Sequence, residues 1–165
     1  MNVLDALLQR FRDKIMRFRT ALDRFNNDTA ETEKVGPNWN VRDLVGHLVY
    51  WTTEGADRLP EIAKASVGWV ELDDDEANTR AAMAALPVYD IERINADVFK
   101  KYRRMSYVML LPQLRAAEEK FLSALSRVEP KLLVGETPVR MWINIYLEHY
   151  DHHWTGLKAA MERLR

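Results

Sequence analysis

The sequence predicts an all-α protein and, within that class, a four-helix bundle with short extra helices between the second and third long ones. Three observations support this. Gly and Pro are scarce, with six of each in 165 residues, apolar residues recur at spacings of three and four, and no alternating, strand-like run is present. A chain of this length is most simply one domain over residues 1–165, large enough to bury a core without covalent cross-links.

The first helix is expected from about Val3 to Phe25, and the polar run NNDT ends it. A polar loop should follow as far as the segment VGPNWN. The apolar residues of this helix share one amphipathic stripe. They are Leu4, Leu7, Leu8, Phe11, Ile15, Phe18, Leu22 and Phe25.

The second helix is expected to start after Asn40, which is a good N-cap. Asp43 lies three positions later and gives a weaker form of the capping box. We expect Pro60 to kink this helix or to end it early. Its buried face should contain Val41, Leu44, Leu48, Trp51, Leu59 and Ile62.

The next region, residues 66–89, is the least regular part of the chain. Its acidic residues from Asp73 to Glu76 could start a short helix, because negative charge is favourable at a helix N-terminus. The region is also long enough to form a functional lid over a site.

Helical periodicity returns at Ile91 and is disturbed between Arg104 and Pro112. Ser106 could cap a new helix there, whereas Pro112 argues for a break or a kink. A clean amphipathic stripe then continues to Val128, which gives the third long helix of the bundle.

Composition and charge exclude several classes of function. There is no Cys, so disulfides and Cys-ligated metal sites are excluded, and any sulfur nucleophile must come from a small-molecule thiol. The net charge is −1, and the basic run from Lys100 to Arg104 is interpreted as a solvated helix face, not a phosphate-binding patch. The N-terminus does not resemble a signal peptide, and no stretch could span a bilayer. We therefore expect a cytoplasmic protein with neither nucleic acid nor a membrane as partner.

The last helix should start at the N-cap Thr137 with Pro138 as its first residue, and it carries three of the four histidines. Each residue turns a helix by about 100°. Angles around the helix are measured here from Met141, and the apolar face is then centred at about 120°. His149 falls at about 80° and His153 at about 120°, so both should point into the core, whereas His152 falls on the border at about 20°.

Two interpretations of this histidine pair stay open. Histidines four residues apart on one helix face have the geometry to chelate a metal ion. They could equally be core residues that form hydrogen bonds with neighbours such as Tyr146 or Tyr150, because ionisable groups on a buried face must be satisfied.

The candidate third ligand is His47, on the second helix. It lies about 90° from the centre of the apolar face, beside Leu44 and Trp51, where it could lean across a gap between helices. Bundles build metal sites from inward-facing side chains in this way, and three imidazoles leave positions on the ion open for water or substrate. Asp43 and Glu54 share its face and could orient its ring, although we favour a surface position for both.

At this point the chain resembles the DinB-like superfamily of bacterial four-helix-bundle proteins, which includes the YfiT-like and ClbS-like groups. The resemblance is carried by WNVRDLVGHLVYW (Trp39 to Trp51) and EHYDHHWTGL (Glu148 to Leu157), and the middle segment IERINADVFKKYRRMSYVMLLPQLRAAEEKFLSAL looks like the run into the third helix of the family. The resemblance covers nearly the whole chain. No single motif is highly specific, and the specificity comes from the order and separation of the motifs together.

This resemblance implies an up-down-down-up bundle in which His47, His149 and His153 bind a divalent ion, often nickel or zinc, while His152 has no necessary role. It also implies frequent homodimers and, for some members, thiol-dependent isomerase or transferase activity with mycothiol or bacillithiol.

Two functions are compatible with these features. The first is a metal-dependent transferase, isomerase or hydrolase in which the ion acts as a Lewis acid or lowers the pKa of a bound water or thiol. The second is a non-catalytic, metal-stabilised or ligand-sequestering bundle that acts as a homodimer. Catalytic residues are not assigned. Tyr50, Tyr146 and Tyr150 could orient a substrate but are interpreted mainly as packed aromatic residues with satisfied hydroxyl groups. Trp51, Trp142 and Trp154 are interpreted as core and rim residues.

Overall fold

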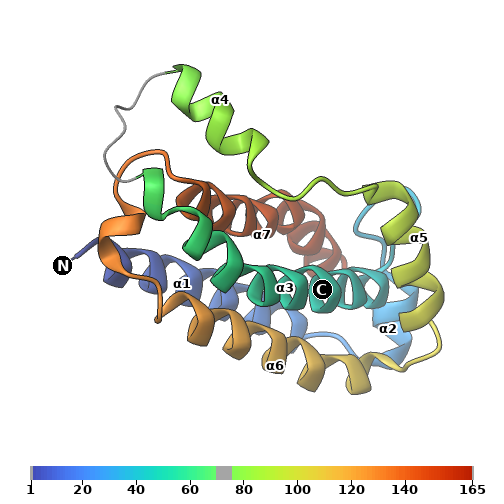
Figure 1. Ribbon diagram of the computed structural model, residues 1–165. Helices are drawn as coiled ribbons and strands as arrows, with labels where there is room; N and C mark the ends of the chain where they lie inside the picture. Colours follow the sequence, from blue (N-terminus) through green and yellow to red (C-terminus); the bar gives the residue numbers. More distant parts are fainter. Residues whose placement is uncertain (1, 70–75, 165) are drawn as a thin grey trace.

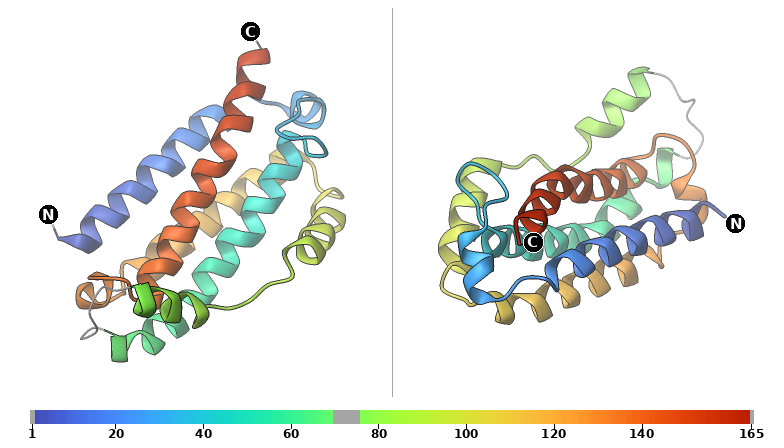
Figure 2. Two further views of the ribbon diagram at one scale, coloured as in Figure 1. Left: turned by 90° about the horizontal axis from the view of Figure 1, so that it is seen from above. Right: turned by 180° about the vertical axis from the view of Figure 1, so that it is seen from behind.

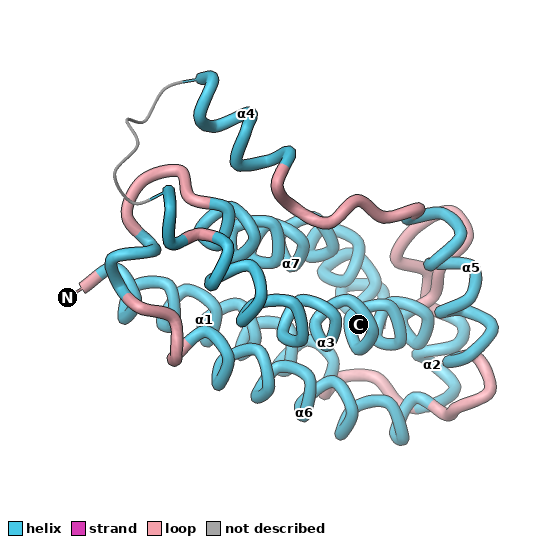
Figure 3. Tube along the Cα trace, in the orientation of Figure 1, coloured by secondary structure: helices cyan, strands magenta, loops and turns pink. Residues whose placement is uncertain are grey.

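The computed structural model describes residues 2–69 and 76–164, which are mostly helical (Figure 1). Within these ranges β-structure is limited to an isolated bridge between Lys34 and Asn40, so the all-α class is confirmed (Figure 3). The long helices are α1 (Val3–Leu22), α3 (Val41–Ala65), α6 (Tyr107–Leu125) and α7 (Pro138–Arg163). The shorter ones are α2 (Asn27–Thr32), α4 (Glu76–Ala84), α5 (Ile91–Tyr102) and the 3₁₀ helices η1 (Val67–Trp69) and η2 (Pro130–Leu133).

Side-chain contacts establish how the long helices run. Between α1 and α6, Phe11 stacks on Phe121 with ring centroids 4.6 Å apart, and the Tyr107 hydroxyl donates to the Leu22 carbonyl at 2.7 Å. Because the residue numbers run in opposite directions, these helices are antiparallel. Figures 1 and 2 show α1 and α7 running one way and α3 and α6 the other, which is the order that the resemblance implies.

A polar network lies inside the otherwise apolar core. The Glu118 side chain is fully buried and forms an ion pair with Arg19 at 2.7 Å. It also accepts a hydrogen bond from the Tyr150 hydroxyl at 3.2 Å. Burial raises the pKa of Glu118, and the Arg19 guanidinium opposes that shift. The buried carboxylate is therefore tolerated because both neighbours satisfy it.

The two interior prolines do not end their helices, so the early end expected at Pro60 and the break expected at Pro112 are wrong, whereas the alternative of a kink at either residue stays a prediction. α3 continues through Pro60 to Ala65, with Leu59 and Ile62 buried on either side of it. An interior proline costs a helix about 3 kcal/mol or more, and burial of such apolar side chains offsets a loss of that size. α6 does begin directly after Ser106 as expected, although that side chain forms no capping hydrogen bond.

The segment after α1 was also predicted incorrectly. α1 ends at Leu22 instead of Phe25, and the polar run that we expected to be a loop starts α2. Asn26 and Thr29 form a reciprocal capping box there, with the Thr29 amide donating to Asn26 Oδ1 at 2.9 Å. A short polar segment can begin a helix when both ends of its first turn are satisfied in this way. Of the acidic run expected to start a short helix, residues 73–75 lie outside the described residues, and α4 is described from Glu76 onward.

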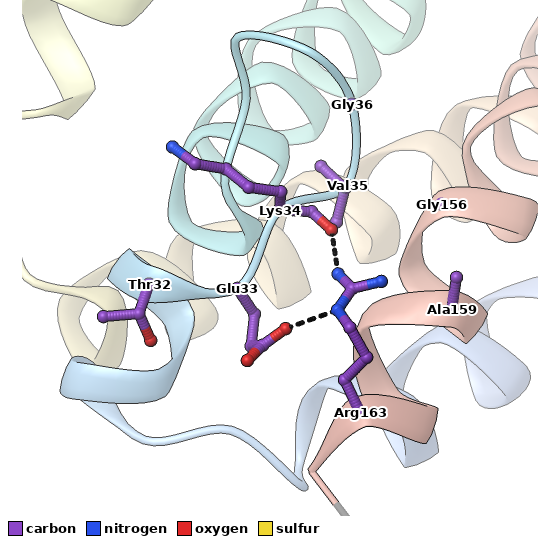
Figure 4. Close-up of a pocket in the computed structure, with 8 residues that line it drawn as sticks. All are labelled: Thr32, Glu33, Lys34, Val35, Gly36, Gly156, Ala159 and Arg163. Atoms are coloured by element: carbon purple, nitrogen blue, oxygen red, sulfur yellow. Dashed lines mark hydrogen bonds and ion pairs between the residues drawn. The ribbon is translucent and has the colours of Figure 1, made fainter.

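The connection between α2 and α3 is held against the end of α7 (Figure 4). Arg163 donates to the Glu33 carboxylate at 2.8 Å and to the Lys34 carbonyl. Gly156 allows the Val35 carbonyl to approach closely, because a Cβ atom on it would lie 2.2 Å from that oxygen. These contacts fix the segment that leads to Trp39. We name this set of contacts, between residues 33–35 and residues 156–163, the α7 clip.

None of the helices in the described part of the chain is long and apolar enough to cross a membrane.

Candidate metal centre

The structure brings together the three histidines that the sequence singled out. Nε2 of His47 on α3 lies 2.7 Å from Nε2 of His149 and 3.2 Å from Nε2 of His153, and the two α7 nitrogens are 3.0 Å apart. The same three residues form a group whose ligand atoms could hold one metal ion. His152 is exposed and stays outside the group, with its ring 5.1 Å from that of His153.

Helix periodicity explains the α7 pair, since residues four apart lie on one face. His47 needs a different explanation, because we expected it at the boundary of α3 and its side chain is 4% exposed. The short helix α5 packs against α3 on that side (Figure 2). It converts the boundary of α3 into an interior position, which helix-wheel reasoning on one helix cannot show.

Asn95, on α5, sets the protonation pattern of His47. Its Oδ1 atom lies 2.9 Å from Nε1 of Trp51 and 3.1 Å from Nδ1 of His47. An indole N–H can only donate, so the Asn95 atom that faces it must be the oxygen. His47 Nδ1 must then carry a proton to donate to the same oxygen. The lone pair of His47 therefore resides on Nε2, which faces the other two histidines.

The sequence did not identify Asn95, although one signal was present. The amide falls on the same stripe of α5 as the apolar residues Ile91 and Val98, four positions after one and three before the other. A polar side chain on such a stripe indicates a hydrogen-bonded partner inside the fold.

The two acidic residues that we considered as partners of His47 have other roles. Asp43 is 4% exposed, so its expected surface position is wrong. It completes the capping box of α3 and pairs with Arg103 at 2.8 Å. Glu54 lies partly exposed, where it accepts from the Tyr89 hydroxyl at 2.9 Å and pairs with Arg58 at 3.0 Å.

Burial keeps the three imidazoles neutral. Desolvation, reinforced by the neighbouring histidines, lowers the pKa of His47 to about 2 and that of His153 to about 3. The same causes lower the pKa of His149 to about 4. Neutral imidazole is the form that binds a metal ion, so no proton would have to leave these rings at pH 7.

The spacing of the three nitrogens can be compared with known coordination. An ion about 2.1 Å from each nitrogen would see the observed separations at angles of about 80–100°. That range matches three adjacent corners of an octahedron better than the ~109° of a tetrahedron. Imidazole donors suit zinc, nickel, iron and copper, so the residues present fit a divalent first-row ion with open positions.

A pocket of about 810 Å³ opens beside the three Nε2 atoms. Trp39 covers one side of them, with its ring 4.7 Å from that of His47 and 5.7 Å from that of His153. Residues after α4 form another wall, so the described end of the 66–89 region does lie at the site. The lining comprises Trp39, His47, Trp51, Met83, Leu86, Pro87, Val88, Tyr89, Ile91, Asn95, Trp142, Ile145, Tyr146, Glu148, His149, His152 and His153.

The aromatic residues near the site have more than one role. Trp51 and Trp142 are buried, as a packing role requires, and both also line the pocket. Tyr150 does not reach the pocket, because it is fully buried against Glu118 and Thr52.

The fold and the site therefore define a helical bundle with a candidate metal centre. Three imidazole nitrogens from two helices converge beside an open pocket. A family model of the DinB superfamily matches residues 10–155. The chain therefore belongs to the DinB superfamily. Comparisons with the curated proteins and with the solved structures found no match.

Proposed function

We propose that this chain binds one divalent metal ion through Nε2 of His47, His149 and His153 and that the centre acts on a small molecule in the adjoining pocket. The observation that carries the proposal is the convergence of three nitrogens within 2.7–3.2 Å. A structural zinc site would close its fourth position with a protein ligand. Here the open side of the cluster faces a pocket instead, as a reactive site requires.

Each residue around the cluster has a defined task in this proposal. Asn95 holds His47 in the tautomer that presents Nε2, and Trp51 holds Asn95. Trp39 covers His47 and His153 and limits access of water from that side. The bound ion would supply Lewis-acid activation of a ligand group. We propose that the ion is nickel or zinc, because the donors are imidazoles and because proteins of the family that the chain resembles often bind these ions.

Because the chain contains no Cys, a sulfur nucleophile would be a small-molecule thiol. The enzyme that we propose is a transferase, an isomerase or a hydrolase that uses such a thiol or water. A second candidate is a bundle that sequesters its ligand without turnover. It is favoured by the scarcity of carboxylates in the described pocket lining, where Glu148 is the only one. For both we propose a homodimer, on the resemblance alone, and light scattering in solution tests it.

Metal analysis tests the proposal directly. The wild type, His149→Ala and His152→Ala are each incubated with Ni²⁺ or Zn²⁺, desalted and measured by plasma mass spectrometry. We expect about one ion per chain in the wild type and in His152→Ala, and none in His149→Ala, because two imidazoles hold an ion far less tightly than three. Retention of the ion by all three proteins, or by none of them, contradicts the proposed site.

Turnover separates the two candidate functions. The metal-loaded wild type is assayed with a low-molecular-weight thiol and an electrophile such as an epoxide or a halonitrobenzene. Metal-dependent product that disappears in His149→Ala supports the enzyme. Tight binding of the small molecule without product supports sequestration.

A further inference from the structure

The pocket beside the histidines lacks cationic side chains. Of the described residues that line it, none is Lys or Arg, and the titratable ones are Glu148, the exposed His152, two tyrosines and the three clustered histidines. Arg58 lies close in sequence to the lining residues of α3 but is paired with Glu54 and Glu61. An anionic group at the aromatic rings of this pocket, away from the metal-binding nitrogens and from His152, would therefore find no Lys or Arg partner among the described lining residues.

Part of the pocket wall consists of aromatic rings that pack against each other. Trp51 meets Tyr89 edge to face, with ring centroids 5.3 Å apart, and Trp142 meets Tyr146 at 5.1 Å. These rings support one another, so they form a surface that is already in place before a ligand binds. A volume of about 810 Å³ lies in the range of pockets that enclose drug-sized molecules.

Such a pocket discriminates between ligands by charge. Burying an unpaired carboxylate or phosphate against aromatic walls is strongly unfavourable. A neutral apolar body gains from the burial. A cationic one also gains from aromatic faces and from a nearby carboxylate.

We propose that the pocket binds the apolar, aromatic-sized body of a neutral or cationic small molecule and rejects bodies that carry a carboxylate or a phosphate. This inference rests on the proposed function, since the donor group of the molecule, a thiol in the first instance, would reach the three histidines. The inference therefore limits the thiol substrates of the proposed enzyme to those with no acidic group in the part of the molecule that enters the pocket.

Three thiols with one head group test the inference. They are 4-methylbenzyl mercaptan, its 4-aminomethyl analogue and its 4-carboxyl analogue, titrated into the Co²⁺-loaded chain. Binding is read from sulfur–cobalt charge-transfer absorption and from quenching of tryptophan fluorescence. We expect the carboxyl compound to bind at least tenfold more weakly than the neutral one, and the amine to bind at least as tightly as the neutral one. Equal or tighter binding of the carboxyl compound overturns the inference.

A charge placed in the lining provides the matched variant. Ile145 lines the pocket and is 39% exposed, so Ile145→Lys should fold and should reduce the discrimination against the carboxyl compound about tenfold. Met16→Lys places the same charge on an exposed position of α1, outside this pocket, and should leave the discrimination unchanged. The same change in both variants would contradict a local effect.

Failure of the metal site and failure of this inference give different results. If the chain binds no Co²⁺, the proposed function fails. Fluorescence titration of the metal-free chain with 1-naphthylmethanol and 1-naphthoate then still decides the charge preference, since Trp39, Trp51 and Trp142 line the pocket. Preference for the alcohol supports the pocket inference, and preference for naphthoate overturns it.

Discussion

Replacing Asn95 with Ala removes the acceptor that holds the His47 ring in the tautomer required for metal binding. In the wild type, Asn95 Oδ1 accepts from His47 Nδ1 at 3.1 Å and from Trp51 Nε1 at 2.9 Å. Without it, the imidazole can rotate or carry its proton on Nε2, where it would face the ion. We therefore expect Asn95→Ala to weaken metal binding although it changes no ligand.

The two lost contacts determine the size of the effect. Removing a hydrogen bond that orients a ligating histidine lowers metal affinity about 10–100-fold, or by about 1.4–2.7 kcal/mol at 25 °C. The metal-free chain should also lose about 1–3 kcal/mol of unfolding free energy, because two donors are left without their partner in part-buried positions. Affinity and stability should therefore fall together in this variant.

Competition with a chromophoric chelator measures the affinity for Zn²⁺, and urea unfolding measures the stability. Asn95→Asp keeps an acceptor and should bind at least as tightly as the wild type, because a carboxylate accepts more strongly. Asp97→Ala, at an exposed position of the same helix, is the matched control and should change neither quantity. Unchanged affinity in a folded Asn95→Ala would refute the role assigned to this residue.

Three further predictions concern stability, and urea unfolding measures each. Gly156→Ala should lower the unfolding free energy by about 1–3 kcal/mol, because its Cβ atom would lie 2.2 Å from the Val35 carbonyl oxygen. Gly36→Ala is the control and should have little effect, because the space around Gly36 is open. Arg19→Leu should cost about 3–5 kcal/mol by leaving Glu118 buried and unpaired, and replacing both by Leu should recover most of that loss. The metal-free chain should lose stability as the pH falls below about 6.5. The loss should be about 2 kcal/mol per metal-site histidine between pH 7 and pH 5. The reason is that the pKa of each histidine is lower in the folded chain than in the unfolded chain, so the unfolded chain takes up protons first.

The outcomes that would contradict these predictions are specific. Equal stability of the two glycine variants would mean that the α7 clip is loose. A stable Arg19→Leu variant would mean that water or another side chain compensates Glu118. Flat stability from pH 7 to pH 5 would mean that the histidines titrate alike in the folded and unfolded chains, and therefore that they are not desolvated.

The fold was predictable wherever one helix determines its own buried face. Residues such as Leu44 and Leu48 repeat at helical spacing and are buried, and Asn40 and Thr137 cap the helices expected of them. The pair His149 and His153 followed from the same periodicity. The early end expected at Pro60 did not occur because burial of flanking apolar residues such as Leu59 and Ile62 outweighs the local helix-breaking preference of proline.

What the sequence could not provide are contacts between distant segments. Asp43 was placed at the surface because its partner Arg103 lies sixty residues away in the chain. Asn95 was missed because its role depends on α5 packing against α3, and helix periodicity contains no information about that approach. Charge pairing and amide orientation of this kind become visible only when the helices are assembled.

The assembled site depends on four segments that meet at one end of the pocket. α3 and α7 supply the ligands, α5 supplies Asn95, and the loop held by the α7 clip supplies Trp39. A ligand that binds only the folded arrangement stabilises it by RT ln(1 + [L]/Kd), which is about 2.7 kcal/mol at 100 times Kd. Metal binding should therefore slow amide hydrogen exchange in α5 and in the loop before Trp39 as well as in the two helices that bear the ligands. Protection confined to α3 and α7 would show that the metal-binding histidines are positioned without α5 and the loop.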